Sequence, residues 1–222
     1  MRFNHYYDSV ALDIVGPSEE WANVLTHGLG LLLVLAGIPA LWQGALAGGS
    51  TLHAISAVAF GFGLFLVYLF STLYHLANRP MVRRWMRILD HIAIYFLIAG
   101  SYTPFILLFV NTRSGYTVLT VIWSLTAFGL VYKIFATHKF RLLSTLVYLG
   151  MGWAVVFIIG PMVQRVPWEV LRLILAGGAF YTLGAFVYLF RKMPYYHAVW
   201  HLFVMGGSLC HYLAVIRALQ FV

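Results

Sequence analysis

The sequence contains very little charge. Only 9% of its 222 residues are charged, whereas a soluble globular domain has about 25%. It has 14 Lys and Arg and only six Asp and Glu, while 62% of the residues are hydrophobic. So few charged side chains cannot form the polar shell of a soluble domain, and so apolar a chain does not remain disordered. The composition excludes a soluble enzyme and a disordered chain, and it indicates an integral membrane protein.

Cysteine is nearly absent, since Cys210 is the only one. A single cysteine excludes an internal disulfide and a thiolate-rich metal cluster. The net charge of +8 could indicate a nucleic-acid partner, but the basic residues are divided among short loops between apolar runs. That distribution is typical of membrane orientation, so we expect no nucleic-acid partner.

A cleavable signal peptide is not indicated either. Residues 1–19 have no apolar core. They carry the polar side chains Arg2, His5, Asp8, Asp13 and Glu19. We therefore expect residues 1–19 to form a cytoplasmic tail and the first apolar segment to act as the insertion signal.

Long apolar runs make up most of the remaining chain. A membrane-spanning helix needs about 20 apolar residues, and seven helices of about 22 residues would leave about 68 residues for tails and loops. Helix is the open-chain form that satisfies its own backbone groups in lipid. We predict an all-α polytopic membrane protein, a bundle of seven transmembrane helices in a single domain over 20–222. The predicted spans are 20–43, 52–76, 87–110, 116–136, 142–163, 169–190 and 195–219.

The distribution of Lys and Arg predicts the orientation, because these residues concentrate on the cytoplasmic side. With seven spans, the side of the N-terminal tail carries ten of them: Arg2, Arg79, Arg83, Arg84, Arg87, Lys133, Lys139, Arg141, Arg191 and Lys192. The opposite side carries four: Arg113, Arg165, Arg172 and Arg217. We expect the N-terminus in the cytoplasm and the C-terminus outside.

Several polar residues lie within the predicted spans, where they are energetically costly and indicate a functional site. All belong to span ends on the predicted cytoplasmic side: Glu20, Asn23 and His27, then Ser71 and His75, then Asp90, then His197 and His201. The pairs Ser71/His75 and His197/His201 are four residues apart, so each pair lies on one helix face. Four spans therefore bring polar groups to one depth of the membrane.

Three imidazoles at one depth suggest a zinc site. Zn²⁺ binds neutral His nitrogen, and a catalytic site has three protein ligands and one open position. We predict His75, His197 and His201 as the ligands. Asp90 would act beside the metal as a general base, or would bind it directly, and Ser71 would orient the water or stabilise an oxyanion.

Each of these assignments has a simpler alternative. The histidines could be hydrogen-bonded core groups without a metal. Glu20, Asn23 and His27 could support the site, or they could form an ordinary helix start with acidic charge at its positive end. His211 lies ten residues beyond His201, roughly 15 Å along a helix, and is interpreted as a packed core polar group.

Four sequence motifs carry a resemblance to a known family. The first is E-x-x-N-x-x-[ST]-H at 20–27, and the second is S-x-x-x-H at 71–75. The third begins at Asp90, and the fourth is H-x-x-x-H at 197–201. These motifs resemble, in order, those of the hemolysin III family, and the resemblance covers essentially the whole chain. That family is similar to the progestin and adipoQ receptors (PAQR), which include the adiponectin receptors, and more distantly to alkaline ceramidases.

The resemblance has its own implications for fold and site. It implies seven transmembrane helices with a cytoplasmic N-terminus, in the bacterial inner membrane. It implies zinc at the positions of His75, His197 and His201, with Asp90 in contact with a water on the metal and Ser71 beside the site. Relatives in the wider superfamily hydrolyse amide bonds of ceramide-like lipids.

Three functions are compatible with these patterns. The first is a zinc-dependent hydrolase of a lipid amide or ester, whose partner would be a membrane lipid or fatty acyl substrate. The second is a non-catalytic regulator or sensor of membrane lipid homeostasis, in which zinc holds spans two, three and seven together. The third is a pore, which gains little support because no span carries a broad polar stripe. Protein partners and oligomeric state stay open.

Overall fold

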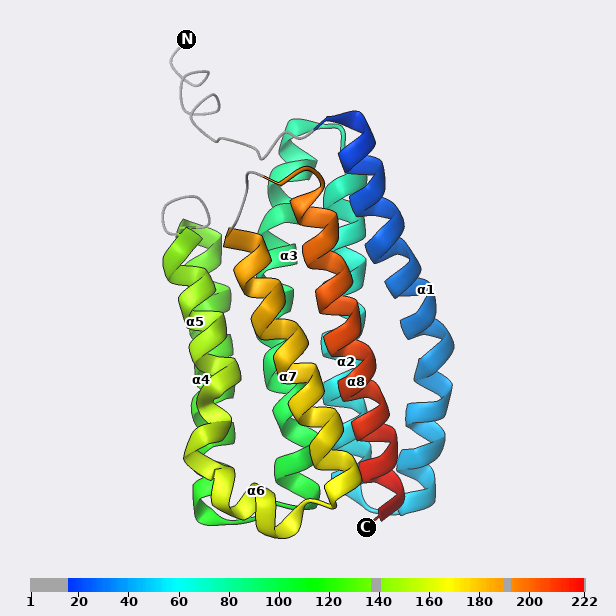
Figure 1. The fold of residues 1–222 in the computed structure, drawn as a ribbon, viewed down its shortest axis with the longest axis vertical. Coiled ribbons are helices and arrows are strands. Elements are labelled where there is room, and N and C mark those ends of the chain that lie inside the picture. The colour runs from blue at the N-terminus through cyan, green and yellow to red at the C-terminus, as the bar shows by residue number, and fades with distance from the viewer. Residues whose placement is uncertain (1–15, 137–140, 190–192, 222) are drawn as a thin grey trace.

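The computed structural model describes residues 16–136, 141–189 and 193–221, and these residues form a bundle of helices (Figure 1). Seven helical stretches are long and apolar enough to cross a membrane, which confirms the predicted all-α, seven-span fold. The helices are α1 (Pro17–Gly48), α2 (Thr51–Leu76), α3 (Pro80–Leu108), α4 (Arg113–Ala136), α5 (Arg141–Trp153), α6 (Ile159–Arg165), α7 (Trp168–Leu189) and α8 (Tyr196–Phe221), with the 3₁₀ helix η1 (Ala154–Ile158) between α5 and α6.

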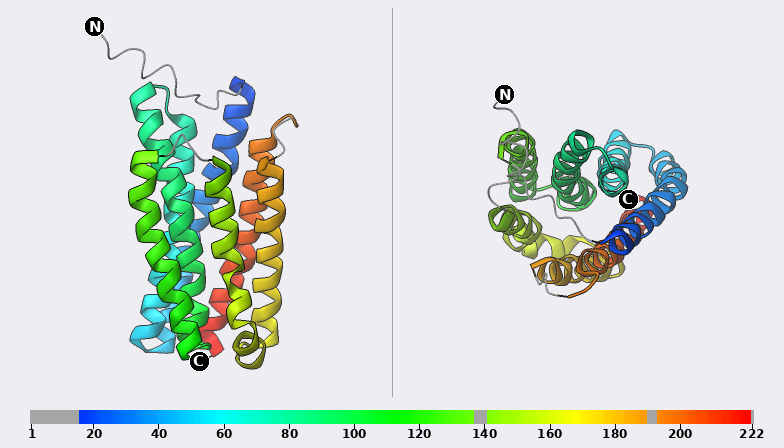
Figure 2. Two further views of the ribbon diagram at one scale, coloured as in Figure 1. Left: turned by 90° about the vertical axis from the view of Figure 1, so that its left-hand side faces the viewer. Right: turned by 90° about the horizontal axis from the view of Figure 1, so that it is seen from above.

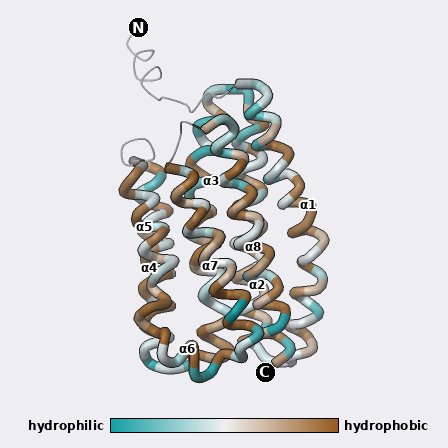
Figure 3. Tube along the Cα trace, in the orientation of Figure 1, coloured by the Kyte–Doolittle hydropathy of each residue, from teal (hydrophilic) through white to brown (hydrophobic). Residues whose placement is uncertain are grey.

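Successive long helices run in opposite directions, so α1 begins at one end of the bundle and α8 finishes at the other (Figure 1). Seen along the bundle axis, the helices surround a common centre (Figure 2). Hydrophilic residues gather at the two ends and hydrophobic residues dominate between them, as expected for a bundle in lipid (Figure 3).

Part of the predicted organisation lies outside the described residues. This holds for residues 1–15 of the predicted tail and for the orientation charges Lys139, Arg191 and Lys192. The ends of the first span differ from the prediction, since α1 runs from Pro17 to Gly48. Proline at the first helical position needs no hydrogen-bond partner for its nitrogen, and Gly49, with φ of 68°, provides the left-handed residue that ends the helix.

The most extensive helix contact joins α2 to α3, the helices that carry Ser71, His75 and Asp90. Two glycines permit this close approach. A Cβ atom at Gly63 would lie 2.7 Å from the Phe96 carbonyl oxygen, and one at Gly100 would lie 2.5 Å from that of Ala59. Any larger residue at either position would push the helices apart and displace the residues of the predicted site.

The fifth span is not the single α-helix that the sequence predicted. It consists of α5, then the 3₁₀ helix η1, then α6. The Tyr102 side chain of α3 supports this irregularity. Its hydroxyl donates toward the carbonyl oxygens of Met151 (2.9 Å) and Gly152 (2.7 Å) and accepts the N–H of Val155 (2.8 Å). Irregular backbone inside a membrane protein requires such a partner, because lipid offers none.

We expect Tyr102→Phe to destabilise the protein by about 1–3 kcal/mol, because it leaves backbone groups of the fifth span without their partner. Thermal unfolding in detergent would show a fall of about 2–4 °C per kcal/mol lost. Tyr116→Phe, at an exposed tyrosine of α4, is the control and should leave the melting temperature unchanged. Equal stability of the two variants would contradict this role of Tyr102.

Candidate metal centre

Three histidines from two helices meet at the end of the bundle where α1 begins. His75 lies in the last turn of α2, and His197 and His201 lie in the first two turns of α8. Each offers one ring nitrogen such that these three atoms lie within 4.8 Å of one another. His201 is fully buried, His75 is 7% exposed and His197 is partly buried. His75 precedes His197 by 122 positions in the chain, yet the three residues form one compact cluster.

Glu20 of α1 and His75 of α2 form a hydrogen bond that fixes the imidazole. His75 Nδ1 lies 2.7 Å from Glu20 Oε2, and the other carboxylate oxygen accepts from Arg83 Nη2 of α3. A carboxylate flanked by Arg83 is ionised and can only accept, so Nδ1 of His75 carries the hydrogen. His75 Nε2 is therefore the nitrogen with a free lone pair, and it is buried without a hydrogen-bond partner among the described residues.

Thr26 holds His201 in the same way. Thr26 Oγ1 lies 3.0 Å from His201 Nδ1, and its single hydrogen is directed at the backbone carbonyls of Ala22 (2.9 Å) and Asn23 (3.0 Å). The hydroxyl must then accept from Nδ1, which leaves the lone pair on Nε2 of His201. This Nε2 is also buried without a hydrogen-bond partner in the described part of the chain.

His27 and Asn23 complete the contribution of α1. The His27 ring stacks on that of His201, with centroids 3.5 Å apart and planes inclined by 19°. Both His27 and Asn23 are only 1% exposed. The face of α1 formed by Glu20, Asn23 and His27 thus lies against the cluster and is not simply a helix start.

Asp90 of α3 is 5% exposed and lies outside the set of three mutually close nitrogens. The hydroxyl of Ser71 lies close to its carboxylate, and Arg87 and Lys133 bring positive charge to it. Asp90 lines the same cavity as His197 but is not one of the three residues whose ring nitrogens lie close together.

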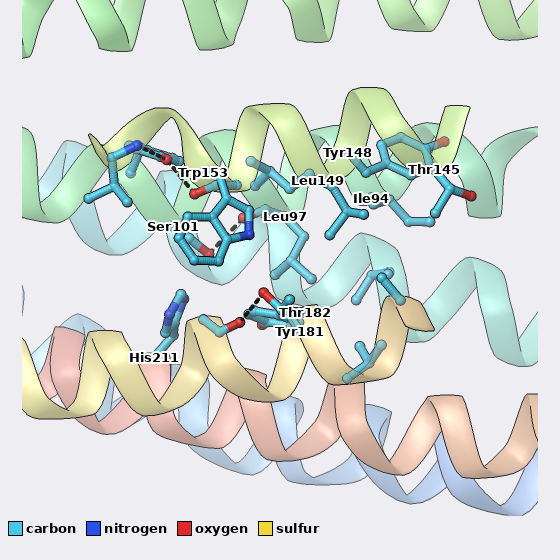
Figure 4. A pocket seen from close by; sticks show the side chains of 18 of the residues that line it. Ile94, Leu97, Ser101, Thr145, Tyr148, Leu149, Trp153, Tyr181, Thr182 and His211 are labelled. Carbon is cyan, nitrogen blue, oxygen red and sulfur yellow. Dashed lines mark hydrogen bonds between the residues drawn. The ribbon is translucent and has the colours of Figure 1, made fainter. Parts of the chain in front are cut away.

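A cavity of about 770 Å³ extends from this end into the bundle. Its walls are mostly apolar, and its polar end is lined by Arg87, Asp90, His91, Lys133 and His197. Figure 4 shows its middle portion, between α3, α5 and α7. A long apolar cavity with one polar end suits an amphiphile.

Lys133 is a site residue that the sequence analysis missed. It lies in α4, is only 1% exposed, and its Nζ donates to Ser144 Oγ at 2.7 Å. It was counted as an orientation charge, although its position inside an apolar span was a signal of function. Thr26 and Arg83 were not predicted as supporting residues either; Thr26 is part of the first motif, which was the available signal.

The cluster fits a transition-metal ion by its donor chemistry. Two of its imidazoles use Nδ1–H in hydrogen bonds and keep Nε2 for a ligand. A metal-bound histidine usually donates its other ring N–H to a carboxylate or oxygen in this manner. Unpartnered buried nitrogens would otherwise be unfavourable, which the presence of a metal would explain.

Comparison with known proteins agrees with this architecture. The family model described as Haemolysin-III related matches residues 15–212. The chain is 41% identical to Hemolysin-3 of Bacillus cereus, over 89% of this chain and 90% of the relative. It is 40% identical to the Hemolysin-3 homolog of Bacillus subtilis (strain 168), over 89% and 93%. It is 27% identical to the human Monocyte to macrophage differentiation factor, over 89% and 83%.

The match of the family model covers most of the chain and all the residues of the cluster. The apolar helices and the bacterial relatives together support an integral protein of the bacterial inner membrane. This chain belongs to the Haemolysin-III related family, with distant similarity to a mammalian PAQR protein.

Proposed function

We propose that the protein is a zinc-dependent hydrolase that acts on an amide or ester bond of a membrane lipid. The observation that carries this proposal is the cluster of His75, His197 and His201, with ring nitrogens within 4.8 Å of one another at the polar end of an apolar cavity. Three neutral imidazoles are the ligand set of a zinc site that keeps one position for substrate or water.

The residues of α1 prepare this ligand set. Glu20 and Thr26 hold the rings of His75 and His201 through their Nδ1 atoms, so each Nε2 keeps a lone pair for a metal. Preorganised ligands lose little freedom on binding a metal, which raises its affinity. A zinc ion held there would supply Lewis-acid chemistry, polarising a carbonyl group and activating water.

Asp90 would perform the proton transfers. One of its carboxylate oxygens accepts a proton from the attacking water as the new carbon–oxygen bond forms. The same oxygen then delivers that proton to the leaving nitrogen or oxygen as the scissile bond breaks. The Ser71 hydroxyl, which lies close to Asp90, would donate a hydrogen bond to negative charge on the carbonyl oxygen.

The cavity supports a lipid as the substrate. Its mostly apolar walls would receive an acyl chain, while Arg87 and Lys133 lie at the polar end with Asp90. The distribution of Lys and Arg in the sequence supports a cytoplasmic position for this end of the bundle.

A regulatory function without catalysis is the second candidate. The cluster joins α2 to α8, and the bonds of Glu20 and Thr26 add α1. A metal at this junction would hold the first, second and last spans together, so that its loss would alter the whole bundle. Such an arrangement suits a sensor of membrane lipid homeostasis.

Purified wild-type protein should contain close to one zinc per chain by elemental mass spectrometry. We expect His75→Ala and His201→Ala each to lose the metal, because the remaining nitrogens are too few for a closed site. His53→Ala, at the other end of α2, is the control and should retain zinc. Wild-type protein that stays free of zinc after zinc is supplied would contradict the proposal.

Glu20→Gln should weaken zinc binding by about 10–100-fold, because the supporting carboxylate orients the ligand and increases its basicity. Competition with a chromophoric chelator would measure the affinity. Glu19→Gln makes the same change one residue away, where the carboxylate accepts from the backbone N–H of Tyr195 instead. An equal loss in both variants would indicate a general charge effect and exclude a supporting role for Glu20.

Asp90→Asn should abolish turnover while zinc stays bound, because an amide cannot accept and return the proton. A loss of about 100-fold or more is expected for a general base. Hydrolysis would be followed by mass spectrometry on a panel of ceramides and N-acyl and O-acyl lipids, with exposed Glu169→Gln as the control. Zinc-loaded wild-type protein without turnover on any lipid, whose stability collapses on chelation, would favour the regulatory function.

A further inference from the structure

The cavity has a side that faces the surrounding lipid, between α5 and α7. Trp153, the last residue of α5, lines the cavity and is also 57% exposed. Leu175 and Leu183 of α7 line it too, and they are 52% and 53% exposed. Figure 4 shows Trp153 on one side and Thr182 of α7 on the other, with Leu97 of α3 between them. Residues of two helices thus border both the cavity and the exterior of the bundle at the same place.

Two glycines leave space between these helices. Gly152 of α5 and Gly178 of α7 are exposed, and both line the cavity. A Cβ atom added at either would meet no heavy atom of a packed neighbour within 4 Å among the described residues. The adjacent Gly177 differs, because a Cβ there would lie 2.2 Å from the His211 ring of α8. α7 therefore packs closely on α8, whereas it makes little contact with α5.

This opening lies at the middle of the membrane. α7 runs from Trp168 to Leu189, so Gly178 is at its centre. The fifth span runs from Leu142 to Arg165, so Gly152 is near its centre as well. Both spans cross a hydrocarbon core of about 30 Å, and the acyl chains of the two leaflets end halfway across it. The lipid groups next to the opening are therefore the ends of acyl chains and not head groups.

The walls behind the opening also suit the end of an acyl chain. They are mostly apolar and include Leu97, Ile98, Ile159, Leu175 and Ala179. A chain that moves from lipid onto these walls exchanges one apolar environment for another and keeps its dispersion contacts. A polar head group could not take this route, because it would have to cross the hydrocarbon core without hydrogen-bond partners.

We propose that the opening between α5 and α7 admits the end of an acyl chain from the bilayer into the cavity, where it lies against α3. The same opening lets a long chain bound at the polar end extend into the bilayer, so the cavity sets no upper limit on chain length. As the route of a substrate this rests on the proposed function, whereas the entry of chains does not require catalysis.

Photocrosslinking of the full protein in lipid nanodiscs tests this entry. The probe is a phosphatidylcholine with a diazirine at the tip of one acyl chain, so its head group stays at the membrane surface while the tip samples the centre. Adducts are located by mass spectrometry of peptides. We expect adducts on Leu97 and Ser101, which are buried and line the cavity from α3. Adducts on Leu33, an exposed residue at the centre of α1, provide the reference for labelling from lipid.

The double variant Gly152→Phe/Gly178→Phe should reduce the α3 adducts about tenfold relative to the α1 reference, because a chain that shares its space with two rings is overpacked. The open surroundings of both glycines accommodate the rings, and Gly178→Phe alone serves if the double variant fails to fold. Gly150→Phe/Gly160→Phe is the matched control. These two glycines of the fifth span have equally open surroundings, and neither is among the described residues that line the cavity. The control should leave the ratio of adducts unchanged.

Three results would overturn the proposal. They are the absence of α3 adducts in wild-type protein, an unchanged ratio in the glycine variants of the opening, and an equal reduction in the control. The same experiment in His75→Ala protein separates this proposal from the proposed function. Adducts on α3 that persist there without zinc would support chain entry while hydrolysis fails. Wild-type protein that binds zinc and hydrolyses a lipid, yet gives no α3 adducts, would overturn chain entry alone.

Discussion

The need to pair polar groups inside an apolar bundle governs the arrangement of this protein. The Glu20 carboxylate accepts from His75 and from Arg83, so a single side chain of α1 ties that helix to α2 and to the start of α3. Lipid offers no alternative partner for these groups, and separating them would leave buried charge. Further along, α1 packs Val34, Leu41 and Ala45 into the core, and Tyr212 of α8 donates to the Gly37 carbonyl oxygen at 2.9 Å, so the polar contacts at its beginning add to this packing.

The same constraint produces the chemistry of the site. Since Glu20 and Thr26 occupy the Nδ1 atoms of His75 and His201, the remaining lone pairs lie on Nε2. The hydrogen bonds of Glu20 and Thr26 therefore hold the helices together and also orient the metal ligands. A substitution at either residue of α1 is expected to affect both the stability of the fold and the metal affinity.

The cavity depends on a departure from regular structure. The fifth span changes from α-helix to 3₁₀ helix and back between Trp153 and Ile159, and both of these residues line the cavity. Tyr102 supplies the partners that this backbone would lack in lipid. Along the cavity, charged residues at one end give way to mostly apolar walls. This order of chemistry matches a long amphiphile rather than a compact solute.

The sequence by itself determined the membrane class, the seven spans and the common depth of the polar residues, because hydropathy and helical spacing are local properties. It also predicted that Ser71, His75, Asp90, His197 and His201 lie at the same depth in the membrane.

Only the tertiary structure decided which polar groups are in contact: Thr26 with His201, Arg83 with Glu20, and Lys133 with Ser144. Contacts between distant segments follow from the rotation and packing of whole helices, such as the close approach at Gly63 and Gly100, which no local pattern encodes. For the same reason the sequence showed His211 as an isolated polar residue, while the packing of the helices brought it to the lining of the cavity.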